Sequence, residues 1–421
     1  MITGKENKAM RYLYQMLLDQ RGGVNPKWDL VLLGGVLGSL YSFLQFVASP
    51  LIGSFSDKYG RRNTLLVTMI GNILSTFIWI FSKSFGWFVL SRVVGGLSEG
   101  NIQLSVAIVS DVTTQKTRSR GLALVGIAFA VSFTIGPAIG AFFASIDLAK
   151  TFPQLVEWGL NPYSMPALVA LLLLVVETTY LYLFLPETVK TSTKKYDDSK
   201  PSAGNSQGSM KQRLRNLTVL NWTHFIFLFF FSGMEFTLTF LTFDLFDFTN
   251  MQNGKLLGYI GILSAMIQGG YVRRKAHELG EKRLVVQGVL SCAISLTIIA
   301  SLTRTSNGIL WLYIGATFLS FTSSTVVNCL TSIASMQCDD EEVQREASTA
   351  DNRVVAKGQA LGIFRSFGQL GRASGPIASC GLYWMAGSEK CYGLGALAML
   401  IILGIVILKV PFVQKAKPKE E

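Results

Sequence analysis

Five ionisable side chains interrupt otherwise apolar stretches of the sequence: Arg92, Glu99, Glu235, Arg365 and Arg372. A charged group inside a membrane is costly, so residues of this kind are functional candidates by default. A carboxyl in apolar surroundings favours its protonated form and can carry a proton. An arginine can attract an anion or neutralise a carboxylate. The five residues therefore predict a site that binds a substrate or couples its movement to protons.

Each of these residues also has a structural alternative. Arg92 and Glu99 are seven residues apart, so on a helix they share a face and can form an internal pair that only holds helices together. Glu235, in FSGMEFTLTF, is expected about 25 Å from the cytoplasmic end of its helix, in apolar surroundings that suit a proton carrier. Arg365 and Arg372 share a second face, where either can bind an anion or neutralise a carboxylate between two halves.

The composition indicates a polytopic membrane protein. The chain has 421 residues, of which 50% are hydrophobic and only 15% charged, whereas soluble domains carry about 25% charged residues. The five cysteines show no disulfide or metal-site spacing, and two histidines argue against a histidine-ligated metal. No G-x-x-x-x-G-K-[ST] loop occurs, which argues against ATP drive. We therefore expect no metal, no cofactor and no enzymatic activity.

A helix needs about 20 mainly apolar residues to cross a bilayer. Eleven stretches qualify, which predicts an all-α membrane protein. Their ranges are 30–54, 64–83, 86–110, 121–144, 164–185, 218–243, 256–271, 284–303, 308–333, 357–385 and 391–412. The polar segment 189–216 is predicted to be a solvated linker between five spans and six. The predicted parts are thus a non-cytoplasmic segment (1–29), two helix bundles (30–188 and 217–412) and a tail (413–421).

The basic residues lie mainly on one side of the predicted spans. The net charge is +12, and alternate loops place 25 Lys and Arg on one side against five on the other. This bias predicts that the basic loops and the C-terminus are cytoplasmic. It also explains the basic composition without a nucleic-acid partner. The membrane could be the plasma membrane or an internal one.

Two internal repeats predict a pair of related bundles. Residues 120–137 and 357–376 both begin with a base and Gly, continue with Ala-Leu and Gly-Ile, and end in Gly-Pro. GSFSDKYGRR (53–62) and GGYVRRKAHELGEKR (269–283) share a basic cluster and a later Gly that precedes further bases. Repeats of this kind are typical of transporter halves. Both landmarks come one span early in the first half, so we expect one helix to be absent from the front of this sequence.

The stretch 53–62 resembles a signature of the major facilitator superfamily, G-x-x-x-D-[RK]-x-G-[RK]-[RK], found between that fold's second and third helices. The matching residues are Gly53, Asp57, Lys58, Gly60, Arg61 and Arg62. Asp111 lies at the cytoplasmic end of the 86–110 span. The resemblance implies that these residues form a charge cluster that holds a cytoplasmic gate shut in one state. A plain solvated loop is the alternative.

The resemblance covers nearly the whole chain. LSRVVGGLSEGN (90–101) is similar to the family's fourth-helix pattern, GPAIG (136–140) to the antiporter pattern of helix five, and LPET (185–188) to the end of helix six. The implied helix-packing residues are Gly96, Gly136, Pro137, Gly140, Gly375 and Pro376. Glu177 lies on a helix that is expected to face outward, so we assign it a structural or lipid-edge role.

The resemblance implies a major facilitator fold with two pseudo-symmetric bundles that works by alternating access, with the substrate bound between them near mid-membrane. The expected substrate is a small amphiphilic organic anion or drug, exchanged for protons in a protein surrounded by membrane lipid. Substrate binding or proton coupling is assigned to Arg92, Glu99, Glu235, Arg365 and Arg372. The alternative is a non-transporting scaffold or sensor, or an inactive truncated form, that keeps the fold.

Overall fold

The structure is a computed structural model that describes residues 26–82, 84–113, 117–144, 154, 164–188, 206–304, 307–338 and 356–411. Its first half contains α2 (Pro26–Tyr59), α3 (Arg61–Ile80), α4 (Phe85–Ser98), α5 (Asn101–Val112), α6 (Arg118–Ala144) and α8 (Ser164–Phe184). Its second half contains α9 (Ser206–Phe246), α10 (Asn250–Ile267), the π-helix η2 (Gln268–Val272), α11 (Arg273–Leu279), α12 (Glu281–Ala300), the 3₁₀ turn η3 (Leu302–Arg304), α13 (Gly308–Met336) and α15 (Lys357–Lys409). No strand occurs in these ranges, which confirms the predicted all-α class.

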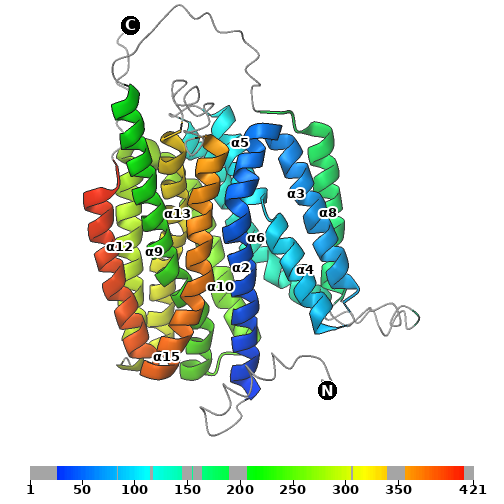
Figure 1. Ribbon diagram of the computed structural model, residues 1–421. Helices are drawn as coiled ribbons and strands as arrows, with labels where there is room; N and C mark the ends of the chain where they lie inside the picture. The colour runs from blue at the N-terminus through cyan, green and yellow to red at the C-terminus, as the bar shows by residue number, and fades with distance from the viewer. Residues whose placement is uncertain are drawn as a thin grey trace, which may run out of the picture.

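Seven of the described helices are long and apolar enough to cross a membrane. All eleven predicted spans lie largely within described helical residues, but the number of crossings stays a prediction. The last two predicted spans share α15, which reverses direction at Gly387, where φ is 83°. Figure 1 shows α15 descending in orange and returning in red.

The predicted span 86–110 is wrong as a single helix. It is divided into α4 and α5 at Glu99, whose φ and ψ are −74° and 88°, and Gly100. At this break the backbone comes close to neighbouring helices, because a Cβ added at Gly100 would lie 2.9 Å from Thr68 Cγ2 and 3.0 Å from Ile52 Cγ2. The apolar pattern continues through the break, so the pattern alone did not reveal it.

The predicted linker 189–216 is helical at its end, because α9 begins at Ser206. Two hydrogen bonds hold this extension against the end of α13: Arg213 Nη1 donates to the Gln337 carbonyl at 3.1 Å, and Asn216 Nδ2 donates to Gln337 Oε1 at 3.0 Å. Residues 189–205, most of the predicted N-terminal segment 1–29 (residues 1–25) and the whole predicted tail 413–421 lie outside the described residues.

The two halves meet mainly along α2 and α15, and their helices share two buried apolar clusters. The larger cluster is formed mostly by α9, α12, α13 and α15 and also includes Val106 and Ala107 of α5 and Leu122 of α6. The smaller cluster joins α2, α3 and α5. Figure 1 shows α2 between the second-half helices and α3, α4 and α8. We call the end where α2 turns into α3 and α15 begins the basic end; it is at the top of Figure 1.

The turns at the basic end confirm the predicted repeat. Gly60 precedes α3 with φ 94° and ψ 153°, and Gly280 precedes α12 with φ 83° and ψ 150°. Residues with a Cβ rarely adopt a positive φ of this kind, which accounts for glycine at both positions. The same backbone conformation therefore joins corresponding helices in the two halves.

A basic residue two positions after each turn glycine makes the same type of contact. Arg62 Nη2 donates to the carbonyl of Tyr182 at 2.6 Å, near the end of α8. Lys282 Nζ donates to the carbonyl of Ile407 at 2.8 Å, near the end of α15. The last turn of a helix has carbonyls without partners in the helix, so a cation there is favourable. In each half, the basic residue after the glycine turn thus forms a hydrogen bond with the last helix of that half.

Candidate functional site

Four charged side chains from both halves meet at the basic end, and we call them the basic-end cluster: Asp57, Arg61, Asp111 and Lys357. Arg61 Nη1 lies 2.7 Å from Asp57 Oδ1, and Arg61 Nε lies 3.1 Å from Asp111 Oδ2. Lys357 Nζ lies 3.1 Å from Asp111 Oδ1. The side chains of Arg61 and Lys357 are only 4% and 7% exposed, so their charges depend on these partners.

Asp57 also binds the first turn of α15. Its Oδ1 accepts a hydrogen bond from the Gly358 N–H at 2.8 Å, and its Oδ2 accepts one from the Gln359 N–H at 2.7 Å. The first N–H groups of a helix lack partners within it and carry partial positive charge, so a carboxylate there is stabilising. Because Asp57 belongs to α2, this cap connects the two halves of the protein.

Glycines allow α2 and α15 to approach this closely. A Cβ on Gly53 would meet the Gly358 carbonyl and would lie 3.3 Å from Gln359 Cα. A Cβ on Gly358 would meet the Arg61 guanidinium and lie 2.6 Å from Asp57 Oδ1. Gly53 of the signature and Gly358 of α15 thus leave the space in which the charges of Asp57 and Arg61 meet α15.

Arg62 and Lys58 of the signature and Glu187 of the LPET stretch lie beside the basic-end cluster. Glu187, from the LPET stretch, accepts hydrogen bonds from the N–H groups of Arg61 at 2.8 Å and Arg62 at 3.1 Å, and so caps α3. Lys58 is exposed, with Nζ 5.0 Å from the centre of the Tyr59 ring. Lys357 was not predicted as a member of this cluster, although it is the basic residue that begins the second copy of the repeat, 357–376.

A cavity of about 490 Å³ lies between the halves, lined by residues of α5, α6, α8, α9, α10, η2, α13 and α15. Its lining is largely apolar and includes four aromatic rings: Phe129, Phe227, Phe231 and Phe364. Sites for small molecules are typically concave and apolar, with a few polar groups that fix orientation. The cavity is of this type.

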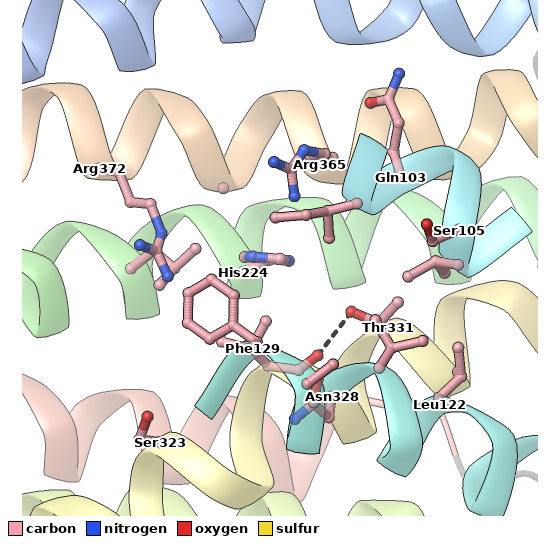
Figure 2. Close-up of a pocket in the computed structure, with 18 of the residues that line it drawn as sticks. Gln103, Ser105, Leu122, Phe129, His224, Ser323, Asn328, Thr331, Arg365 and Arg372 are labelled. Carbon is pink, nitrogen blue, oxygen red and sulfur yellow. Dashed lines mark hydrogen bonds between the residues drawn. The ribbon is translucent and has the colours of Figure 1, made fainter. Parts of the chain in front are cut away.

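Arg365 and Arg372 extend into the cavity from α15 (Figure 2). Arg365 Nη2 donates one long hydrogen bond, 3.5 Å, to Gln45 Oε1. Its Nε has no hydrogen-bond partner among the described residues. Within the described part of the chain, neither guanidinium has an acidic group within ion-pair distance. Such cations are costly when buried, which makes them suited to an incoming anion.

His224 extends from α9 into the space between the two arginines (Figure 2). Its side chain is buried, and its ring packs edge-on against Phe364 with the centroids 4.1 Å apart. Its Nδ1 has no hydrogen-bond partner among the residues described. His224 was not predicted as a site residue, although a single His in the apolar run NWTHFIFLFFF can indicate a polar site.

Two carboxyl side chains line the same cavity. Glu235 comes from α9, as expected of a residue inside the 218–243 span. Glu177 comes from α8, a mostly exposed helix, as predicted, and its side chain is exposed although it borders the cavity. Its structural or lipid-edge role stays a prediction.

The comparisons with known proteins agree with this architecture. Residues 31–350 match the family described as Major Facilitator Superfamily. The chain belongs to the Major Facilitator Superfamily. This superfamily consists of membrane transporters, not enzymes. Together with the apolar helices of this chain, it indicates a multi-pass integral membrane protein.

Two of the following major facilitator proteins are similar over most of this chain, and the third over a shorter stretch. Major facilitator superfamily domain-containing protein 10 of Mus musculus is 33% identical over 404 residues, which are 91% of this chain and 80% of that protein. Its Homo sapiens counterpart is 33% identical over 387 residues, 88% of this chain and 77% of that protein. The tetracycline resistance protein, class H, of Pasteurella multocida is 32% identical over 118 residues, 28% of this chain and 30% of that protein.

Two solved structures are similar in fold. The crystal structure of the human organic anion transporter MFSD10 (TETRAN) has a TM-score of 0.73 at 32% identity, covering 91% of this chain and 86% of that one. The proton:xylose symporter XylE has a TM-score of 0.70 at 15% identity, covering 93% and 88%, which shows the fold alone. The major facilitator fold predicted from the sequence is therefore confirmed.

Two residues predicted from the major facilitator resemblance lie outside the cavity lining. The Arg92 guanidinium lies 4.8 Å from the centre of the Trp79 ring and 5.3 Å from that of Phe88. Glu99 Oε2 accepts a hydrogen bond from the Tyr41 hydroxyl at 3.2 Å. The helix break at Glu99 removes the unbroken face that the two were predicted to share. Their coupling role stays a prediction.

Two predicted packing glycines lie at close approaches within the major facilitator fold. A Cβ on Gly96 would lie 2.9 Å from Leu44 Cβ, where α4 meets α2. A Cβ on Gly375 would lie 2.8 Å from Ser232 Oγ, where α15 meets α9. Neither interface could therefore accept a larger residue without rearranging.

The other predicted packing residues lie differently. Gly136 and Gly140 on α6 have no described neighbour within 4 Å of an added Cβ, so their packing role stays a prediction. Pro376 lies inside α15. Pro137 lies on α6, and its side chain is outside the described part of the structure.

Proposed function

We propose that this protein moves small amphiphilic organic anions or drugs by alternating access, in exchange for protons. The observation that carries the proposal is the position of Arg365 and Arg372, which extend into an aromatic-lined cavity between the halves and have no ion pair with any described residue. A guanidinium binds a carboxylate or sulfonate through charge-assisted hydrogen bonds. A structure of similar fold and 32% identity is that of a human organic anion transporter, which supports this substrate class.

Glu235 is the proposed proton site. It lines the same cavity as Arg372, on the helix packed against α15. A protonated Glu235 leaves Arg372 available to an anionic substrate, whereas an ionised Glu235 competes with the substrate for the same cation. Proton binding at Glu235 and substrate binding at Arg372 would then be coupled.

The basic-end cluster is the proposed gate. Opening the cavity toward the basic end requires that Asp57 leave the first turn of α15 and that Lys357 leave Asp111. The contacts are discrete and join the two halves, as alternating access requires. The excess of basic loops at this end supports a cytoplasmic location for it and for the C-terminus.

Uptake by proteoliposomes tests the proposal. A fluorescent aryl sulfonate is a suitable probe, because its permanent charge prevents it from crossing the bilayer as a neutral acid. We expect flux that responds to an imposed pH gradient, and no flux in the Arg365→Gln/Arg372→Gln double variant. Glu235→Gln should still bind the probe but lose the response to pH. Absence of flux by the native chain, with and without a gradient, would overturn the proposal.

A further inference from the structure

One buried polar residue of the cavity lining, Gln268, comes from η2 rather than from α15, which bears the arginines. Gln268 is only 2% exposed. Its Nε2 has no hydrogen-bond partner among the described residues. A buried amide donor without a partner is costly, so its retention here requires an explanation.

Gln268 is presented by an unusual turn. The Arg273 N–H donates to the Gln268 carbonyl, five residues back, as in a π-helix, and Gly269 and Gly270 lie within this turn. Single π-helical turns are rare and occur frequently at functional sites. The turn places Gln268 at the junction of α10 with α11, where both helices contact α6 of the other half.

The backbone of α6 leaves room for the Gln268 amide. A Cβ added at Gly126 would meet Gln268 Nε2 and would lie 2.6 Å from Asn328 Nδ2. Both carboxamides line the cavity. Two neutral N–H donors from different helices therefore gather at one point of the interface between the halves.

The cavity thus has a cationic wall and a neutral donor wall. Figure 2 shows Arg365, Arg372 and His224 on one side and Asn328 and Thr331 on the other, with Phe129 between. An anion held only at the arginines would leave the Gln268 donor unsatisfied. A substrate with a carbonyl oxygen apart from its charged group would satisfy both walls.

We propose that Gln268 is a specificity-determining residue, whose Nε2 donates a hydrogen bond to a neutral carbonyl oxygen of an organic anion held at Arg365. The expected ligand class is an acylated amino acid or a similar anion with an amide. This inference rests on the anion site proposed above and adds to it a second point of recognition.

Matched pairs of anions test the inference by binding to the purified full-length chain in nanodiscs. The probes are N-benzoyl derivatives of glycine, 4-aminobutyrate and 6-aminohexanoate. Their partners are 4-phenylbutyrate, 6-phenylhexanoate and 8-phenyloctanoate, which have the same chain lengths without the amide. For at least one pair, we expect the benzoyl compound to bind about tenfold more tightly, as one hydrogen bond to a buried donor would give.

Gln268→Leu should reduce this ratio to about one without weakening the phenylalkanoates, whose unchanged binding also proves that the variant is folded. Gly126→Ala should act similarly, because its methyl group would displace the Gln268 amide. Gln103→Leu is the matched control: it removes another carboxamide of the cavity lining, but one whose Nε2 already donates to the Ser49 carbonyl at 3.1 Å. That variant should keep the native ratio.

Two results would overturn the inference and are distinguishable. A native ratio near one, or a ratio that survives Gln268→Leu, would remove the role of Gln268 and leave the anion site intact. Failure of the native chain to bind either kind of probe would remove the anion site as well.

Discussion

The basic-end cluster contains a buried arginine and the cavity contains two half-buried ones, and the partners of these guanidinium groups differ. Arg61 contacts two carboxylates, within 2.7 Å and 3.1 Å, in a cluster that includes Lys357. Arg365 has one long hydrogen bond and, among the described residues, no ion pair. A buried charge with fixed partners holds structure together, whereas one without them is suited to a ligand. The comparison separates residues of the proposed gate from those of the proposed substrate site.

The largest expected effect is that of Arg61→Ala. It leaves Asp57 and Asp111 without their shared cation, so the free energy of unfolding should fall by about 3–5 kcal/mol. Thermal unfolding followed by tryptophan fluorescence measures it. Lys58→Ala is the control: it removes an exposed base of the same signature and should change the stability by less than about 0.5 kcal/mol. Equal melting temperatures for the two variants would remove the distinction.

Arg365→Gln should weaken ligand binding without lowering stability, the reverse of what is expected for Arg61→Ala. Affinity for an aryl sulfonate should fall about 30-fold or more, because the main charged partner of the anion is lost. The melting temperature should stay the same or rise, because the substitution removes a half-buried cation that has no ion pair among the described residues. Titration and thermal unfolding of the same sample measure both. A large loss of stability would show that Arg365 belongs with the structural charges.

A smaller effect is expected from a methyl group in the space between α2 and α15. Gly358→Ala forces a Cβ against Arg61 and Asp57, so it should cost about 1–3 kcal/mol of stability. Gly136→Ala places a Cβ where no described atom lies within 4 Å, and should be neutral or slightly stabilising. Thermal unfolding of both variants checks the contrast, and an equal cost would refute the close packing at the basic end.

The smallest effect concerns the two repeat-related turns. Alanine at Gly60 or Gly280 must adopt a positive φ, which costs about 1–2 kcal/mol in each half. At Gly60 the new Cβ also meets the Glu187 carboxylate, within 2.7 Å of its Cδ, so Gly60→Ala should be the more destabilising variant. The difference in melting temperature between the two variants measures this extra contact. A more damaging Gly280→Ala would contradict the assignment of Glu187 as a cap of α3.

The sequence predicted most of the fold because the spans are long apolar runs. It predicted three members of the basic-end cluster, Asp57, Arg61 and Asp111, because they belong to or follow from the signature. It did not predict the break at Glu99, where apolar residues continue on both sides and only the approach of α2 and α3 to Gly100 distinguishes the position. The helical start of α9 was missed because its support comes from Gln337 on a distant helix.

The candidate site was predicted only in part. Arg365, Arg372 and Glu235 were found because charge in an apolar run is conspicuous, and all three line the cavity. Gln268 was missed, since a neutral amide does not stand out in the sequence and its position depends on which helices meet. His224 was missed although a single His in an apolar run was visible. The outward position of the helix that bears Glu177 was predicted correctly, but not that Glu177 borders the cavity.

The most direct test of the account is the affinity of the aryl sulfonate for three forms of the protein in nanodiscs: the native chain, Arg365→Gln/Arg372→Gln and Arg61→Ala. The account predicts saturable binding to the native chain, loss of binding in the double variant, and affinity within a few-fold of native in folded Arg61→Ala. Native affinity in the double variant would contradict the assignment of Arg365 and Arg372 to the substrate.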